Sequence, residues 1–251
     1  MELIILGSGT CAPSPRRAGP AACLKADGIT ILVDSAAGTL HQMAVAGIHY
    51  ASIDLLLYTH FHVDHIGELA PYIFASRYAG DFIRSTPMEI WGPPGLKAIH
   101  TGLTAIFGQW VEMEPEKMQL REIEENCLKF QSITLQTTQV QHTPQSLAYR
   151  LTDSQGKSIV FSGDTDYCPE LVCLAQKADL FLCECANPEG QKRQGHLMPS
   201  EAGRMAREAQ VKRLVLTHFY PICDRYDPIA PCTKEFDGEI LLAEDLMRIA
   251  V

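Results

Sequence analysis

Basic residues are scarce in this chain. Its 251 residues include 21 lysines and arginines against 30 aspartates and glutamates, so the formal net charge is -9. Proteins that bind nucleic acid over a broad surface normally carry a basic stripe. Nucleic acid is therefore not favoured by charge as a partner, and an anionic substrate must be attracted locally. Arg16-Arg17 is one pair that could hold a phosphate or carboxylate, although two such arginines are more often simply solvated.

Long apolar runs are also missing. No stretch approaches the roughly 20 apolar residues that a membrane-spanning helix needs. The first residues, MELIILG, place an acid where a signal peptide has its basic region, and the apolar run that follows is short. We expect no membrane association and a cytoplasmic location.

The nine cysteines are scattered, odd in number, and contain no C-x-x-C pair. This pattern favours a reduced intracellular chain over a disulfide framework, with Cys183 and Cys185 as core residues on one face of a strand. A hydrophobic content of 46% and a charged content of 20% allow a substantial core. We expect residues 1–251 to form a single domain. The sequence leaves a homodimer open.

The most informative stretch is residues 58–67, YTHFHVDHIG, which directly follows the apolar run from Ile53. Imidazole and carboxylate ligands together suit zinc and neighbouring transition metals. His60 and His62 are two apart, so both rings leave an extended chain on the same side and can chelate one ion. Asp64 and His65 follow and can reach a second ion. Solvated loop residues are the alternative, but four such side chains within six positions make it a poor one.

A second motif is rejected. Residues 7–12, GSGTCA, match the G-x-G-x-x-A dinucleotide fingerprint, with Asp34 near the place of a ribose-binding acid. Pro13, Pro15 and Pro20 follow at once, and the fingerprint must open a helix. The glycines are better explained by a tight turn.

Several elements can be predicted from local pattern. Asp27-Gly28 between two apolar runs predicts an antiparallel hairpin of 21–26 and 29–33. Helices are expected at 38–47, 66–76 and 96–107, which leaves His41, His49 and His100 at the surface. The acidic stretch 112–125 is expected to be a solvated face or edge.

Three further strands end in metal-competent side chains. The run 133–140 precedes His142, 157–161 precedes Asp164, and 213–216 precedes His218. A shared sheet edge is the usual location of ligand sites in layered α/β folds. One site therefore explains all four strand ends.

The order of these residues resembles the metallo-β-lactamase superfamily. Its seven metal positions are all filled, by His60, His62, Asp64, His65, His142, Asp164 and His218. The chain is most similar to the ribonuclease Z branch, through LGSG at 6–9, GPPG at 92–95, SGDT at 162–165 and Gly195-His196. The resemblance implies a four-layer αββα sandwich, of class α/β, with two mixed sheets and helices outside.

The resemblance also implies two divalent metal ions, zinc first, with Mn²⁺ or Fe²⁺ as alternatives. His60, His62 and His142 would hold one ion, Asp64, His65 and His218 the other, and Asp164 would bridge them. Glu184 takes the place of a family glutamate, and His196 that of a histidine implicated in proton donation. Asp64 would also help to position the nucleophile.

Two features depart from the branch. Ribonuclease Z carries a long arm that grips transfer RNA, whereas residues 150–157 here predict a short turn, so the arm is missing. The arginine that commonly follows Gly-Asp-Thr in the family is replaced by Asp166. The scaffold is kept, and the parts that grip a polynucleotide are not.

The expected function is a binuclear metal-dependent hydrolase, and most simply a phosphodiesterase for a small or flexible anionic ester. His196, held by Glu184, would protonate the leaving alkoxide; the alternative is that His196 caps a helix near Pro199. Ribonuclease Z-type transfer-RNA 3′ processing, or hydrolysis of lactones, thioesters or sulfate esters, are the other hydrolytic functions. A non-catalytic metal-binding module is disfavoured by the full ligand set.

Overall fold

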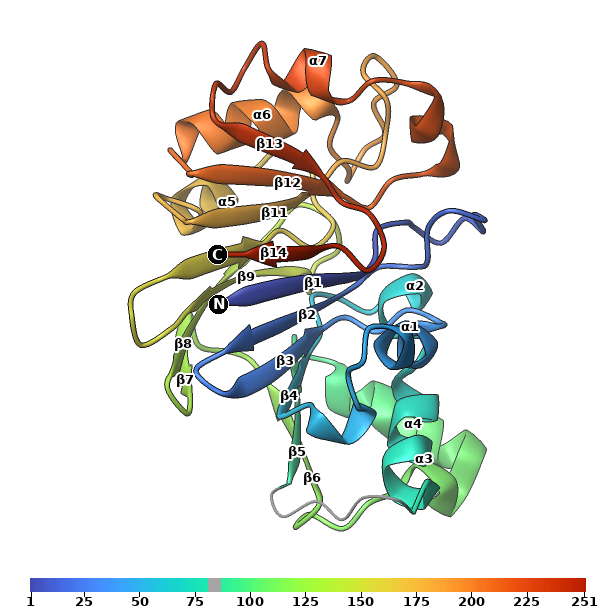
Figure 1. Ribbon diagram of the computed structural model, residues 1–251. Helices are drawn as coiled ribbons and strands as arrows, with labels where there is room; N and C mark the ends of the chain where they lie inside the picture. The colour runs from blue at the N-terminus through green and yellow to red at the C-terminus, as the bar shows by residue number, and fades with distance from the viewer. Residues whose placement is uncertain (81–86) are drawn as a thin grey trace.

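Two seven-stranded sheets stack face to face in the computed structural model, which describes residues 1–80 and 87–251 (Figure 1). The first sheet has the order β14-β1-β2-β3-β4-β5-β6 and the second β13-β12-β11-β10-β9-β8-β7. Each is antiparallel along one side and parallel along the other. The predicted α/β sandwich with two mixed sheets is confirmed.

The strand bounds are as follows. The first sheet contains β1 (Glu2–Gly7), β2 (Ala21–Ala26), β3 (Ile29–Val33), β4 (Leu55–Leu57), β5 (Met88–Gly92), β6 (Met118–Glu122) and β14 (Arg248–Ala250). The second contains β7 (Cys127–Phe130), β8 (Ile133–Gln139), β9 (Leu147–Thr152), β10 (Ser158–Phe161), β11 (Leu180–Glu184), β12 (Arg213–Thr217) and β13 (Glu239–Leu242).

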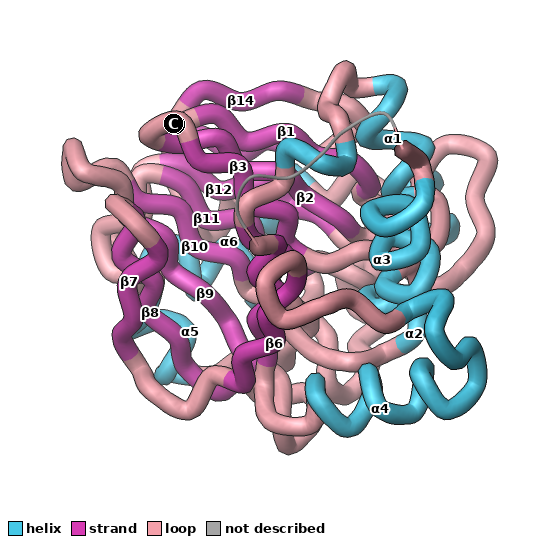
Figure 2. The backbone as a smooth tube through the Cα atoms, turned by 90° about the horizontal axis from the view of Figure 1, so that it is seen from below, coloured by secondary structure: helices cyan, strands magenta, loops and turns pink. Residues whose placement is uncertain are grey.

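Helices cover the outer faces of both sheets. The first sheet carries α1 (Thr39–Val45), α2 (Val63–Ile66), α3 (Leu69–Tyr78) and α4 (Leu96–Phe107), which Figure 2 shows gathered along one side of the strands. The second carries α5 (Pro169–Leu174), α6 (Pro199–Glu208) and α7 (Ile229–Cys232), and short 3₁₀ turns are η1 (Tyr50–Ser52), η2 (Gly108–Val111) and η3 (Pro221–Arg225). No helix among the described residues is long and apolar enough to cross a membrane.

Three apolar layers hold the stack together. The central layer lies between the sheets and includes Leu57, Trp91 and Phe161. The outer two lie between a sheet and its helices, and include Tyr72 of α3 and Met205 of α6. Each large side chain that is fully buried contributes roughly 1.5–3 kcal/mol.

Most local predictions are confirmed. Asp27 and Gly28, with φ of 52° and 79°, turn the β2–β3 hairpin, and the acidic stretch supplies β6 at the sheet edge. Residues 8–20 form a loop without a helix, as the prolines predicted. Residues 153–157 are a short turn between β9 and β10. All nine cysteines are free, and Cys183 and Cys185 are buried.

Two local predictions need correction. The helix expected over 66–76 is observed as α3, which begins at Leu69, and Ile66 instead ends the separate short helix α2. Between the two helices, the carboxylate of Glu68 accepts the backbone N–H groups of Gly38 and Leu40. His41 and His49 are exposed as expected, but His100 is half-buried and its ring contacts the carbonyl of Val111 at 3.1 Å.

Candidate metal centre

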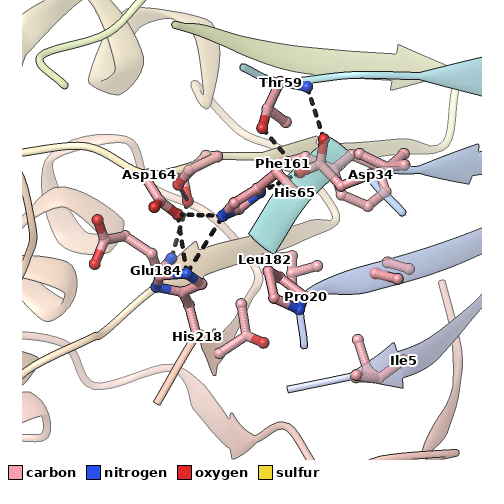
Figure 3. Close-up of a pocket in the computed structure, with 17 residues that line it drawn as sticks. Ile5, Pro20, Asp34, Thr59, His65, Phe161, Asp164, Leu182, Glu184 and His218 are labelled. Carbon is pink, nitrogen blue, oxygen red and sulfur yellow. Dashed lines mark hydrogen bonds and ion pairs between the residues drawn. The ribbon is translucent and has the colours of Figure 1, made fainter. Parts of the chain in front are cut away.

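The strands β4, β8, β10 and β12 end at one edge of the stack, and the loops that follow them converge there. All seven side chains predicted as metal ligands fall into two groups of donor atoms within 4.8 Å of one another. Figure 3 shows His65, Asp164 and His218 pointing toward one another from separate elements. The predicted convergence of four strand ends is therefore observed.

The first group joins three imidazoles and a carboxylate. His62 Nδ1 lies 3.1 Å from His60 Nε2 and 3.0 Å from His142 Nε2. Asp164 Oδ2 lies 3.7 Å from His60 Nε2 and 3.6 Å from His142 Nε2. A tetrahedral zinc site with bonds near 2.0–2.1 Å has donor atoms about 3.3 Å apart. The residues present fit such an ion.

The second group has similar spacing. His65 Nε2 and His218 Nε2 lie 3.4 Å apart, and Asp164 Oδ1 is 3.3 Å and 3.4 Å from them. Asp64 Oδ2 completes the group at 3.9 Å from His218 Nε2. Asp64 and His65 leave α2 together, whereas His218 follows β12 with a positive φ of 61°. A second divalent ion fits these four donors.

Asp164 connects the two groups. Its Oδ2 faces the first and its Oδ1 the second, and the carboxylate is almost fully buried. Burial alone would raise the pKa of Asp164, but His218 and His65 hold it well below its usual range. Gly163, at φ 58°, allows the turn that frees this carboxylate from β10, and a Cβ there would lie 3.0 Å from Thr59 Cβ. One oxygen of Asp164 is therefore available to each group.

Outer partners fix the imidazole tautomers. His65 Nδ1–H donates to Asp34 Oδ2 at 2.8 Å, and His142 Nδ1–H donates to the Gly195 carbonyl at 2.9 Å. Thr59 Oγ1 lies 3.0 Å from His60 Nδ1. Each of these contacts leaves an Nε2 lone pair directed at the centre.

Asp34 is a functional residue that the sequence reasoning missed. It follows β3 at a positive φ of 58°, is buried, and accepts both the N–H and the hydroxyl of Thr59 (Figure 3). The sequence pattern that predicted the other site residues also applies to Asp34, because Asp34 is a polar residue directly after a buried strand.

His196 and Glu184 form a further pair beside the centre. His196 Nδ1 lies 3.0 Å from Glu184 Oε1, and the ring also groups with Asp164 and His218. Burial would lower the pKa of His196, but the hydrogen bond and charge of Glu184 raise it overall. The N-cap of α6 is Met198, whose N–H donates to Glu201, so His196 does not cap that helix.

Glu184 is held by the backbone around it. Its carboxylate accepts N–H groups from Thr165 and Leu197, at 2.7 Å and 3.1 Å. Burial raises its pKa. The carboxylate is thus fixed in position to orient His196.

The arginine pair of the Pro-rich loop has another role. Arg17 donates to Asp224, the hydroxyl of Ser8 and the carbonyl of Ala243, and its guanidinium lies 4.7 Å from the centre of the Phe219 ring. Arg16 also faces Asp224, at 3.6 Å. The charge of Arg17 is used within the protein, so Arg17 is neither a free anion site nor simply solvated. The side chain of Arg16 is 63% exposed and remains largely solvated.

The chain matches the family model described as Beta-lactamase superfamily domain over residues 29–219. It is 31% identical to a Ribonuclease Z of Mycobacterium sp. (strain KMS), in an alignment that covers the whole chain and 96% of the relative. A Ribonuclease Z of Mycobacterium marinum is 28% identical, with coverage of 100% and 99%. The first alignment runs over 283 positions, more than the 251 residues here, so the relative has segments that this chain lacks.

Solved structures resemble the whole chain. The metallo-beta-lactamase fold protein YhfI from Bacillus subtilis superposes with a TM-score of 0.85 at 21% identity, covering 99% of this chain and 98% of that one. The short form of human tRNase Z superposes with a TM-score of 0.80 at 25% identity, covering 100% and 99%.

Proposed function

The chain belongs to the metallo-β-lactamase superfamily, with ribonuclease Z-like relatives, and from that membership we propose that it is a binuclear metal-dependent phosphodiesterase. One observation carries the proposal: Asp164 directs one oxygen at each of two donor groups whose spacing suits a divalent ion. Two-metal sites stabilise the attacking and leaving oxygens of an in-line displacement, which suits a phosphodiester.

The donor set favours zinc, because five imidazoles and two carboxylates are typical zinc ligands, with manganese and iron as alternatives. His60, His62 and His142 would hold one ion, Asp64, His65 and His218 the other, and Asp164 would bridge them. When bound, the ions supply Lewis-acid activation of water and of the phosphoryl group.

The protein's own residues supply the proton and the orientation. His196 donates its Nδ1–H to Glu184, so the proton on its other ring nitrogen is available to a leaving alkoxide. The hydrogen bond and charge of Glu184 outweigh burial and raise the pKa of His196, which favours the protonated form that a general acid needs. Of the two candidate ligand carboxylates, Asp64 is more exposed than Asp164, at 18% of its side chain against 4%. Asp64 therefore lies at the open side of the centre, where it helps to position the nucleophile.

A panel of substrates tests this function. Metal-loaded protein is incubated with an aryl phosphodiester, a lactone, a thioester and an aryl sulfate, and kcat/KM is measured for each. We expect kcat/KM for the phosphodiester to exceed that for the other substrates by about tenfold or more, because a two-metal site stabilises both the attacking and the leaving oxygen of its displacement. A higher kcat/KM for an acyl or sulfate ester would assign the site to that chemistry instead.

Ribonuclease Z activity is the second candidate, and the curated relatives named Ribonuclease Z favour it. Against it stand the excess of acids and the short 153–157 turn, because phosphate contacts dominate nucleic-acid affinity. We infer that a small or flexible phosphodiester is the better substrate. Efficient cleavage of a precursor transfer RNA after its discriminator base, at physiological salt, would reverse this choice.

We further infer that residues 1–251 act as one domain, because β14 near the C-terminus pairs with β1 and shares the central core. A reduced cytoplasmic setting fits nine unpaired cysteines.

A further inference from the structure

The loop between β11 and α6 carries two adjacent basic residues in opposite settings. The ammonium of Lys192 lies 2.7 Å from Asp166 and 2.6 Å from Glu201, so two carboxylates share its charge. Arg193 is exposed, and among the described residues no carboxylate lies within ion-pair distance of its guanidinium. Lys192 therefore holds the loop, whereas the charge of Arg193 remains available.

An aromatic ring supports the guanidinium of Arg193. Its central carbon lies 5.2 Å from the centre of the Tyr220 ring, and the hydroxyl of Tyr220 lies 3.6 Å from Cys11 Sγ. Stacking on an aromatic face restricts a guanidinium while leaving its edge donors free. Such an edge matches two oxygens of a phosphate.

Arg193 and Tyr220 are both close to the candidate centre, in the sequence and in space. The carbonyl of Arg193 accepts the N–H of His196 at 3.2 Å, and Tyr220 is two residues beyond His218. The ring of His196 in turn stacks on the ring of His218, with 5.7 Å between the ring centres. The loop that carries Arg193 and the segment that carries Tyr220 therefore meet at the candidate centre.

We propose that Arg193 is a specificity residue that binds a second phosphate of the substrate, next to the phosphodiester that is cleaved. This inference rests on the proposed function and narrows it to phosphodiesters that carry a further phosphate. In a chain of net charge -9, Arg16 and Arg17 face Asp224, and Arg193 is a free cation beside the site. It supplies the local attraction that an anionic substrate needs.

Two matched substrates test the proposal on the metal-loaded full chain. Thymidine 5′-(p-nitrophenyl phosphate) has one phosphate, and its 3′-phosphorylated form has two, with the same leaving group. We expect Arg193→Met to raise KM about tenfold for the second substrate and much less for the first, because an arginine–phosphate contact is lost only there. Arg193→Lys should recover part of the loss. Arg213→Met, at the opposite end of β12 from His218, removes an equal charge and should change neither.

Equal changes on both substrates, or none on the second, would overturn the proposal. Binding gives an answer that does not need turnover: by calorimetry, wild type should prefer thymidine 3′,5′-bisphosphate to thymidine 5′-phosphate, and Arg193→Met should lose this preference. If neither ester is hydrolysed but the preference is lost, the proposed function fails and the phosphate site stands. A single-stranded RNA dodecamer identifies the source of the phosphate: kcat/KM above that of the small doubly phosphorylated ester indicates a polynucleotide, and below it a small molecule.

Discussion

The ring of His65 illustrates how single contacts prepare this centre. Asp34 fixes its Nδ1 proton, so that Nε2 faces Asp164 and His218. Asp34 is held in turn by Thr59, the residue directly before His60. Outer partners of this kind set the basicity and orientation of metal ligands.

Asp34→Asn tests that role. Asparagine tolerates the positive φ at this position and can still accept from Thr59, but it is a weaker acceptor for His65. We expect metal affinity at the second site to fall by about 10- to 100-fold, with little loss at the first. Metal titration of the two sites checks this, and an equal loss at both would indicate general distortion.

His196→Ala separates proton donation from metal binding. A general acid matters when the leaving group is poor, so kcat should fall by about 10²-fold or more with an alkyl leaving group and much less with a nitrophenyl one. The ratio of the two rates is the measurement. Equal losses would show that His196 binds substrate or supports the structure.

At the scale of elements, the parallel strands β10, β11 and β12 of the second sheet are tied together at both ends. Their carboxyl ends meet at the candidate metal centre, and Asp179 joins the opposite ends. Its carboxylate accepts the backbone N–H of Ser158, the first residue of β10, and lies 3.2 Å and 2.8 Å from the ammonium groups of Lys157 and Lys212. A local cluster thus fixes the starts of β10, β11 and β12.

Asp179→Asn should lower the free energy of unfolding by about 1–3 kcal/mol at pH 7, because charge-assisted hydrogen bonds are lost. Burial would raise the pKa of Asp179, but Lys212, Ser158 and Lys157 lower it to about 2. Because the pKa of Asp179 is lower in the folded state than its ordinary value of 3.8, its ionised carboxylate stabilises the fold at pH values above 3.8. This stabilisation is lost as the pH falls toward 2. Denaturant unfolding between pH 7 and pH 2 measures the free energy of unfolding. The difference between wild type and Asp179→Asn should shrink as the pH falls, whereas Asp237→Asn, at an exposed position, should not differ from wild type at any pH.

At the scale of the whole molecule, the candidate metal centre joins the two halves of the chain. His60, His62, Asp64 and His65 come from the first sheet's half of the chain, and His142, Asp164 and His218 from the second. Metal ions held between these residues would therefore link the two sheets. A ligand that binds only the folded state stabilises it by mass action.

We expect two metal ions per chain by elemental analysis and a lower unfolding temperature after chelation. Asp164→Ala should lose metal and hydrolysis together, since its two oxygens serve both groups. A protein that keeps fewer than two ions after mild purification, with an unfolding temperature unaffected by chelator, would contradict this prediction.

The sequence by itself determined the fold class and the candidate ligand set, because the order of its motifs resembles the metallo-β-lactamase superfamily. Short-range regularities supported that resemblance: apolar runs that form strands, Asp27-Gly28 at a hairpin, and polar side chains placed directly after strands. His60, His62, Asp64 and His65 lie within six residues, so their proximity requires no knowledge of tertiary structure.

Only the tertiary structure decided which polar groups pair across the chain. Asp34 and His65 are 31 residues apart, and Arg17 and Asp224 are 207 apart, so no local spacing could show that one contact orients a ligand and the other removes a candidate anion site. The same holds for Lys192, which two carboxylates neutralise, and for Arg193 beside it, which stacks on Tyr220 instead. Hydrogen bonds and ion pairs act over about 3–4 Å, and only the folded backbone sets which distant residues come that close.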